Sequence, residues 1–225
     1  DCDYGCGDPS KYVREGETVL DLGSGAGKIC FIASQVVGEH GKVIGVDMND
    51  SMLEVATKFA PVVAETIGFA NVEFRKGNIA NMQGLVDDST IDVVVSNCVL
   101  NLVANIDKPT LFNELFRVTK KGGRAVISDI VANNAVPVEM QNDEHLWSGC
   151  ISGAMKDTAF VEAFAKAGFE EITVVKHDSE PWQTVGGIEF RSMTVVACKP
   201  DANGNTDTGP DPDSNEGCCG SSDCC

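Results

Sequence analysis

The chain has 225 residues and an acidic composition, with 34 Asp and Glu residues against 17 Lys and Arg residues and a net charge of −17. This length is sufficient for one sizeable hydrophobic core. The charge argues against nucleic acids and anionic membrane surfaces as partners, because both are bound by clustered Lys and Arg. We find no signal peptide and no apolar run of the roughly 18 residues that span a bilayer. These features favour small neutral or cationic molecules as partners. We expect the protein to be cytoplasmic and monomeric.

Short runs rich in Val and Ile alternate with longer amphipathic segments over the first 130 residues. Such alternation predicts buried parallel strands joined by helices. Pro61 is expected to kink or interrupt the second helix, and Gly68 and the pair Gly122-Gly123 are expected to end helices. The predicted strands are 19–22, 43–46, 72–75, 91–96 and 124–129, and the predicted helices are 28–37, 51–67 and 110–119.

The last third of the chain closes the sheet and then changes character. A helix over 158–167 and strands over 173–177 and 191–198 complete a doubly wound seven-stranded sheet whose last strand is antiparallel. Residues 131–156 follow the fifth strand, so we expect this insertion to cover the substrate side of the sheet. Residues 1–199 are predicted to form one domain, and residues 200–225, rich in polar residues and cysteine, a disordered tail.

A glycine-rich turn identifies the ligand class. The segment TVLDLGSGAG (18–27) reads as a strand that enters a helix through three alternating glycines, which lets a ligand approach bare backbone. The dinucleotide spacing is absent, and the Asp21 carboxylate would repel a pyrophosphate. It would favour the ammonium group of S-adenosylmethionine instead. Asp47, at the end of the next strand, can accept both ribose hydroxyls or can cap the following helix.

Other residues at strand ends complete the predicted cofactor site, because the carboxyl ends of parallel strands meet at one edge of the sheet. The turn itself contributes Gly23, Ser24 and Gly25. Asn78 follows the third strand and either bonds the adenine amino edge or serves as a turn residue. Asn97 follows the fourth strand and is expected to face the same ligand.

Ten cysteines are present, and their spacing does not predict a disulfide framework. We therefore expect free thiols in a reducing compartment. Cys30 and Cys98 lie among apolar residues and are interpreted as small buried hydrophobes. Cys6 and Cys150 lie in glycine-rich segments and are interpreted as ligands. The predicted folded part has no zinc-type Cys or His spacing. Trivalent arsenic fits better, because thiolates bind it and its lone pair can attack a sulfonium methyl group.

Five segments together resemble the arsenite methyltransferase family, over about residues 3–199. They are YGCG (4–7), VLDLGSGAGKIC (19–30), VGEHGKVIGVDM (37–48), VVVSNCVLNLV (93–103) and GCISGA (149–154). The resemblance implies a class I methyltransferase (Rossmann-like) fold, S-adenosylmethionine as methyl donor, and arsenite or methylated trivalent arsenicals as substrate in arsenic detoxification. It also implies a small thiol or thioredoxin-type reductant. The implied arsenic ligands are Cys6 and Cys150, and the implied cofactor contacts include Tyr4, Met48, Ile79 and Asn97.

The chain departs from the family pattern at two places. A family cysteine upstream of YGCG has no counterpart, since Cys2 is too close to be that residue. Ile188 stands about where a third arsenic ligand is expected, before the last strand. One arsenite valence would then go to hydroxide, to Cys198 or to a tail thiol. The paired tail thiols, which either chelate soft metalloids or form a passive end, are Cys218, Cys219, Cys224 and Cys225.

Two other functions remain compatible with the residues. One is an ordinary small-molecule C- or O-methyltransferase, for which His145 is the candidate general base. The other is a thiol-rich protein that sequesters metalloids and has lost cofactor turnover. Turnover of the cofactor separates the enzymes from the sequestering protein, and the identity of the acceptor separates the two enzymes.

Overall fold

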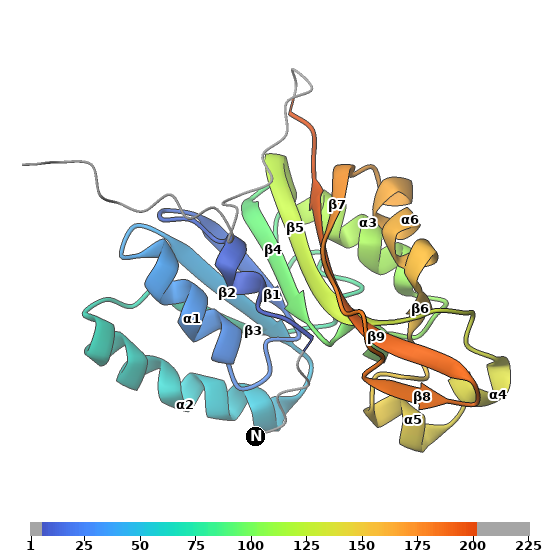
Figure 1. The fold of residues 1–225 in the computed structure, drawn as a ribbon. Helices are drawn as coiled ribbons and strands as arrows, with labels where there is room; N and C mark the ends of the chain where they lie inside the picture. The colour runs from blue at the N-terminus through green and yellow to red at the C-terminus, as the bar shows by residue number, and fades with distance from the viewer. Residues whose placement is uncertain (1–5, 202–225) are drawn as a thin grey trace, which may run out of the picture.

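A twisted sheet with helices on both faces forms the molecule (Figure 1), as seen in a computed structural model that describes residues 6–201. Seven strands follow the order β3-β2-β1-β4-β5-β9-β7, and two short strands pair with β5 and β9. β9 is antiparallel to both of its neighbours, β5 and β7. The strands are β1 (Thr18–Leu22), β2 (Lys42–Asp47), β3 (Val72–Lys76), β4 (Ile91–Asn97), β5 (Thr119–Ala132), β6 (Met155–Lys156), β7 (Glu170–His177), β8 (Gln183–Val185) and β9 (Ile188–Cys198).

The helices cover the two faces of this sheet and bury its apolar side chains. Helices α1 and α2 lie on one face and α3 and α6 on the other, where Phe112, Phe160 and Phe164 stack edge to face. The helical segments are η1 (Pro9–Tyr12), α1 (Lys28–Val37), α2 (Asp50–Ile67), η2 (Leu100–Leu102), α3 (Lys108–Val118), α4 (Val138–Gln141), α5 (Glu144–Ser148) and α6 (Asp157–Ala167).

The predicted doubly wound sheet with an antiparallel last strand is confirmed. Three details were wrong. Helix α2 continues through Pro61 without interruption, and Gly122-Gly123 lie inside β5 rather than at a helix end. Strands β6 and β8 were not predicted, because each is only two or three residues long and depends on its partner strand. Gly68 ends α2 with a φ of 90°, as expected for a helix-ending glycine.

The insertion after β5 contains α4, α5 and β6. In Figure 1 it lies beside β8 and the beginning of β9, at the end of the sheet where β5 finishes. Asn101, from η2 after β4, donates to the backbone oxygens of Ile130 and Cys150. The insertion is therefore held against the ends of β4 and β5.

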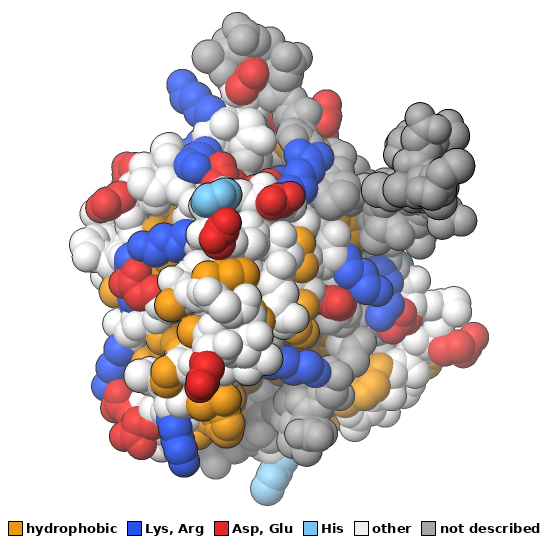
Figure 2. All heavy atoms as spheres, turned by 90° about the vertical axis from the view of Figure 1, so that its left-hand side faces the viewer, with side chains coloured by type: hydrophobic (Ala, Val, Ile, Leu, Met, Phe, Trp, Pro, Cys, Tyr) orange, Lys and Arg blue, Asp and Glu red, His pale blue; other side chains and the backbone are white. Residues whose placement is uncertain are grey.

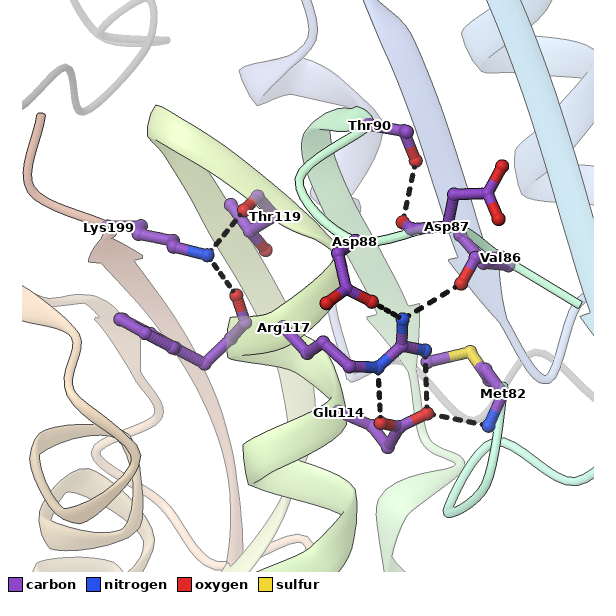
Figure 3. A network of polar contacts seen from close by, with 10 residues as sticks. Met82, Val86, Asp87, Asp88, Thr90, Glu114, Arg117, Thr119 and Lys199 are labelled. Atoms are coloured by element: carbon purple, nitrogen blue, oxygen red, sulfur yellow. Dashed lines mark hydrogen bonds and ion pairs between the residues drawn. The ribbon is translucent and has the colours of Figure 1, made fainter. Parts of the chain in front are cut away.

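Polar contacts around Arg117 tie α3 to the chain that precedes β4 (Figure 3). The Arg117 guanidinium donates to both carboxylate oxygens of Glu114, at 2.6 and 2.9 Å, and to the Val86 carbonyl oxygen at 3.0 Å. Glu114 also accepts from the Met82 backbone N–H. Lys199, just after β9, donates to the backbone oxygens of Phe116 and Thr119. These bonds fix the end of the sheet that lies away from the glycine-rich turn.

The outer side of α2 carries exposed apolar side chains. Met52, Val55, Phe59 and Val62 are exposed, and Figure 2 shows apolar side chains at the surface of the face that includes this helix. The helix is amphipathic, and none of the described helices is long and apolar enough to cross a membrane.

Candidate active site

The chain leaves β1 through a turn that exposes backbone. Gly23, Gly25 and Gly27 have φ angles of 69°, 52° and 89°, a region that side-chain-bearing residues rarely adopt. A Cβ at Gly25 would meet nothing within 4 Å, whereas one at Gly23 would lie 2.3 Å from the Val99 side chain. The backbone at Gly25 is thus open to a ligand, while Gly23 packs against the segment after β4.

Asp47 connects this turn to the end of β2. Its carboxylate accepts the Gly25 N–H at 2.8 Å and the Asn49 N–H at 2.8 Å. Each oxygen receives one hydrogen bond and keeps further acceptor capacity. The carboxylate is therefore fixed in orientation and can still accept two hydroxyl groups. Asn49, rather than Asp47, caps the following helix, because its side-chain oxygen accepts the backbone N–H groups of Ser51 and Met52.

Two buried polar atoms in this region lack a partner. Among the described residues, the Ser24 hydroxyl oxygen and the Asn97 side-chain oxygen are the buried side-chain polar atoms without a hydrogen bond. Buried polar groups are normally paired, and an unpaired one requires an explanation. Both residues were predicted from the sequence to contact the cofactor. Their unmet hydrogen-bonding capacity fits a polar ligand between the turn and the end of β4.

Asp21 lies beneath the same turn, with only 2% of its surface exposed. Its carboxylate accepts a hydrogen bond from the Cys30 thiol, at 3.2 Å. Burial raises the pKa of the Asp21 carboxyl to about 7; the Cys30 bond opposes this rise and the nearby Asp47 charge adds to it. A buried acid near neutrality is easily ionised by a cation, so the site suits the ammonium group predicted for it.

The remaining predicted cofactor residues differ in how they are placed. The Asn78 side chain accepts the Ala80 N–H at 2.9 Å, as a turn residue does, and its amide keeps further hydrogen-bonding capacity. Ile79 is buried, whereas Met48 is 71% exposed beside Asp47. Tyr4 lies outside the described residues.

Three cysteines meet at the end of the sheet next to Asn97. Cys6, Cys98 and Cys150 belong to one buried apolar cluster, which also contains Ile130 and Ile188. Cys6 and Cys98 form a disulfide, and the Cys150 sulfur lies 3.4 Å from the Cys98 carbonyl oxygen. Cys98 is buried among apolar residues, as expected, but the expectation that Cys6 and Cys98 are free thiols was wrong. In this bonded arrangement the described residues contain no group of three His, Cys, Asp or Glu arranged to hold a metal ion.

The backbone is unusual at two of these cysteines. Cys98 has a φ of 57° and Cys150 a φ of 59°, and they account for two of the four non-glycine residues with positive φ in the described chain. This conformation costs free energy for a residue with a Cβ, and such strain is concentrated at functional sites. The Cys98 backbone is held by a hydrogen bond from its N–H to the Ser128 carbonyl oxygen.

Cys6 is held against β5 and β9. Its carbonyl oxygen accepts from the Ser192 hydroxyl. The next residue, Gly7, lies over the hydrogen-bonded hydroxyls of Ser128 and Thr194, and a Cβ there would come within 2.7 Å of the Ser128 oxygen. Only glycine allows the segment that carries Cys6 to approach the sheet this closely.

The structure does not support the other thiol considered within the folded domain. Cys198 pairs with Arg124 in the β5–β9 ladder, whereas the cysteine cluster is near the Ala132–Phe190 pair. Eight residues of strand separate these positions, roughly 26 Å at 3.3 Å per residue. Cys198 thus cannot complete a site with Cys6 and Cys150. Ile188 packs in the cluster as an apolar residue, and the third sulfur atom there belongs to Cys98. The four tail cysteines lie outside the described residues.

Comparisons with known proteins identify the family of the chain. A family model described as "Methyltransferase domain" matches residues 13–173. An arsenic (III) S-adenosylmethionine methyltransferase from Chlamydomonas reinhardtii has a solved structure that superposes with a TM-score of 0.80, at 32% identity over 88% of this chain and 68% of that one. The chain belongs to the arsenite methyltransferase family. 

Curated members of the arsenite methyltransferase family also match most of the chain. The one from Aquipseudomonas alcaligenes is 38% identical over 88% of this chain and 59% of its own length, and the human one is 35% identical over 90% of this chain and 56% of its own length. The chain therefore spans less than two thirds of the length of these relatives.

A buried carboxylate lies close to these cysteines. Asp129, fully buried in β5, accepts from the backbone N–H groups of Leu100 and Ile130, both at 2.8 Å. Burial raises the pKa of Asp129 to about 6. Burial raises the pKa of the Cys150 thiol to about 12, with a smaller contribution from the Asp129 charge. Cys150 is consequently a protonated thiol at neutral pH.

Proposed function

We propose that this domain methylates trivalent arsenic, with S-adenosylmethionine as methyl donor, and thereby detoxifies arsenite or methylarsenite. The observation that carries the proposal is that Cys6, Cys98 and Cys150 lie together in one cluster. Cys98 directly follows Asn97, whose buried side-chain oxygen has no hydrogen-bond partner. A thiophilic acceptor site thus adjoins the predicted cofactor site. The membership of the chain in the arsenite methyltransferase family supports the same reading.

The residues around the glycine turn suit the cofactor. Asp47 would accept the ribose hydroxyls, Asp21 would face the ammonium group, and Ser24 and Asn97 would gain the partners that they lack. When bound, S-adenosylmethionine supplies an electrophilic methyl group on a sulfonium. Gly25 leaves room for a ligand to approach the backbone, and Asp47 fixes that turn by its bond to the Gly25 N–H.

The thiols must be reduced before they bind arsenic. A dithiol reductant would convert the Cys6–Cys98 disulfide into two thiols and would itself become a disulfide. Each thiol then condenses with one As–OH group: the sulfur bonds arsenic, and the thiol proton leaves with the hydroxide as water. A protonated Cys150 is suitable for this step, because its own proton converts the leaving hydroxide into water. No general base is required for the capture.

The apolar surroundings favour attack by arsenic rather than by water. Ile130, Ile151 and Phe190 are buried around the cysteines. They exclude solvent from the place where the arsenic lone pair would meet the methyl group, and the reaction then depends mainly on positioning and desolvation. The need for reduced thiols favours a small thiol or thioredoxin-type reductant and a cytoplasmic location. With its net charge of −17, the chain is proposed to act as a monomer without nucleic-acid or membrane partners.

Turnover with separate acceptors tests the proposal. The domain would be incubated with S-adenosylmethionine and a dithiol, and with arsenite, methylarsenite or no acceptor, while S-adenosylhomocysteine and arsenic products are quantified. The proposal expects cofactor turnover that depends on the arsenical and equals the methylated arsenic formed. Arsenical binding without turnover would instead indicate a sequestering protein. Turnover only with small organic acceptors would favour the C- or O-methyltransferase alternative, whose candidate base, His145, lies exposed on α5.

A further inference from the structure

Asn101 connects the two loops that carry Cys98 and Cys150. It lies in η2, three residues after Cys98, and only 3% of its surface is exposed. Its side-chain amide donates to the Ile130 carbonyl oxygen at 2.7 Å and to the Cys150 carbonyl oxygen at 3.1 Å. One side chain therefore links the end of β4, the end of β5 and the backbone of a cysteine in the insertion.

The same junction is closed by backbone packing. A Cβ placed on Gly153 would lie 1.9 Å from the Asn101 carbonyl oxygen, so the two loops touch at a point where only glycine fits. The buried Asp129 carboxylate accepts the N–H groups of Leu100 and Asn101, at 2.8 and 3.4 Å. Lys108 donates to the Gly153 carbonyl oxygen from the other side. These contacts, which do not involve sulfur, hold the Cys98 and Cys150 loops together in addition to the contact of the Cys150 sulfur with the Cys98 carbonyl oxygen.

The three thiols differ in how they depend on this junction. Cys6 and Cys98 are already adjacent, since their sulfurs are bonded in the disulfide, and Cys6 is held by Ser192 rather than by η2. Cys150 is carried by the insertion, and its carbonyl oxygen is one of the two acceptors of Asn101. Loosening of the junction would therefore separate Cys150 from a Cys6–Cys98 pair that remains intact.

We propose that Asn101 is a positioning residue that holds Cys150 at the distance needed for three-thiol capture, and so sets the preference for arsenite over methylarsenite. This inference rests on the proposed function. Arsenite has three exchangeable hydroxyls and forms three As–S bonds with release of three waters. Methylarsenite has two exchangeable hydroxyls, and the reduced Cys6 and Cys98 thiols can replace both of them. Loss of Asn101 therefore weakens the arsenite complex and leaves the methylarsenite complex unchanged.

Binding measurements without the cofactor test this inference. The domain, kept reduced with a phosphine so that no added thiol competes, would be dialysed to equilibrium against arsenite or methylarsenite, and bound arsenic would be counted. The variants are Asn101→Ala and, from the opposite loop, Gly153→Ala. The control is Asn105→Ala, which removes an exposed amide bonded to Gln141. We expect Asn101→Ala to lose arsenite affinity on the order of tenfold, the effect of a lost buried hydrogen bond. Gly153→Ala should lose arsenite affinity as well, because its added Cβ would meet the Asn101 carbonyl oxygen and push the two loops apart. The affinity of both test variants for methylarsenite should stay unchanged. The affinities of the Asn105→Ala control for arsenite and for methylarsenite should stay unchanged as well.

The ratio of the two affinities within one protein separates positioning from general damage. A variant that is merely less stable would lose both arsenicals in proportion, and that result in both variants would overturn the inference. Unchanged arsenite binding in folded Asn101→Ala and Gly153→Ala, checked by thermal unfolding, would also overturn it. Failure of the unsubstituted domain to bind arsenite would overturn the proposed function and this inference together.

Discussion

The Cys150 sulfur lies 3.4 Å from the carbonyl oxygen of Cys98, although the two residues are 52 positions apart in the chain. Cys98 in turn is bonded to Cys6, 92 positions away. A site assembled from three distant segments, two of them with left-handed cysteine backbones, is a costly arrangement for a purely structural cluster. This arrangement supports the proposal that the cysteine cluster binds arsenic.

Replacement of Cys98 by serine tests its reassignment from core residue to ligand. A hydroxyl is a poor ligand for a soft centre, so Cys98→Ser should lower the arsenite methylation rate by at least roughly 100-fold; even changes behind a metal ligand cost about 10–100-fold. The matched control is Cys198→Ser, a buried cysteine at the other end of the sheet, which should alter stability alone. Initial rates at saturating cofactor measure both. Normal arsenite turnover by Cys98→Ser would refute its role as a ligand.

Asp47 should be essential for cofactor binding. Asp47→Ala removes the acceptor for the Gly25 N–H and for the proposed ribose hydroxyls. Hydrogen bonds to charged groups contribute about 1.5–3 kcal/mol each, so the affinity for S-adenosylhomocysteine should fall by one to several orders of magnitude. Calorimetric titration provides the measurement, with Asp50→Ala, which loses an exposed ion pair to Lys76, as the control. Equal affinities in the two variants would remove Asp47 from the site.

The buried Asp21 carboxyl predicts a pH dependence. Its pKa in the folded protein, about 7, lies above the ordinary 3.8, so the folded state holds its proton more tightly than the unfolded state does. Its contribution to stability is complete below pH 3.8 and is lost as the pH rises toward 7. A cationic ligand favours the ionised form, so cofactor affinity should rise between pH 6 and 7 and level off above.

Asp21→Asn should abolish both effects. The ligand-free variant should be more stable at pH 8 by about 1–3 kcal/mol, and its weaker cofactor affinity should not change with pH. Chemical denaturation and calorimetry across this pH range provide the measurements. A variant that retained the pH dependence of cofactor affinity would show that another group causes it.

Gly7 should be needed to place Cys6. The added Cβ of Gly7→Ala would lie 2.7 Å from the Ser128 oxygen and 2.9 Å from the Thr194 oxygen, and should cost about 1–3 kcal/mol of unfolding free energy through overpacking. Gly16→Ala is the control, because Gly16 also has a positive φ but its Cβ would meet nothing within 4 Å. The difference between the two isolates the steric effect. Equal losses would mean that the close approach is unimportant.

The apolar runs of the sequence predict β1 to β5, because buried parallel strands have a distinctive composition. The ends of β5 could not be predicted in the same way. Residues 119–123 and 130–132 join the strand through pairing with β4, β6 and β9, and such pairing leaves little local signal. Pro61 was misjudged, because α2 continues through it and ends only at Gly68.

The candidate site was predictable where residues follow strand ends. Asp47 and Asn97 fulfil this rule, and the same rule would have placed Cys98, the residue after Asn97, at the site. Its apolar neighbours favoured a core interpretation instead, since a buried ligand and a buried hydrophobe have the same local sequence. The role of Asn101 depends on contacts with Ile130 and Cys150, which no local pattern contains.

X-ray absorption at the arsenic edge tests the central claim most directly, because it counts the sulfur atoms bound to arsenic. The reduced domain, with residues 202–225 deleted so that tail thiols cannot contribute, would be loaded with one equivalent of arsenite. We predict three sulfur neighbours, falling to two in Cys98→Ser and in Cys150→Ser and staying at three in Cys198→Ser. Two or fewer sulfur neighbours in the unsubstituted domain, or three that persist in Cys98→Ser, would contradict a site built from Cys6, Cys98 and Cys150.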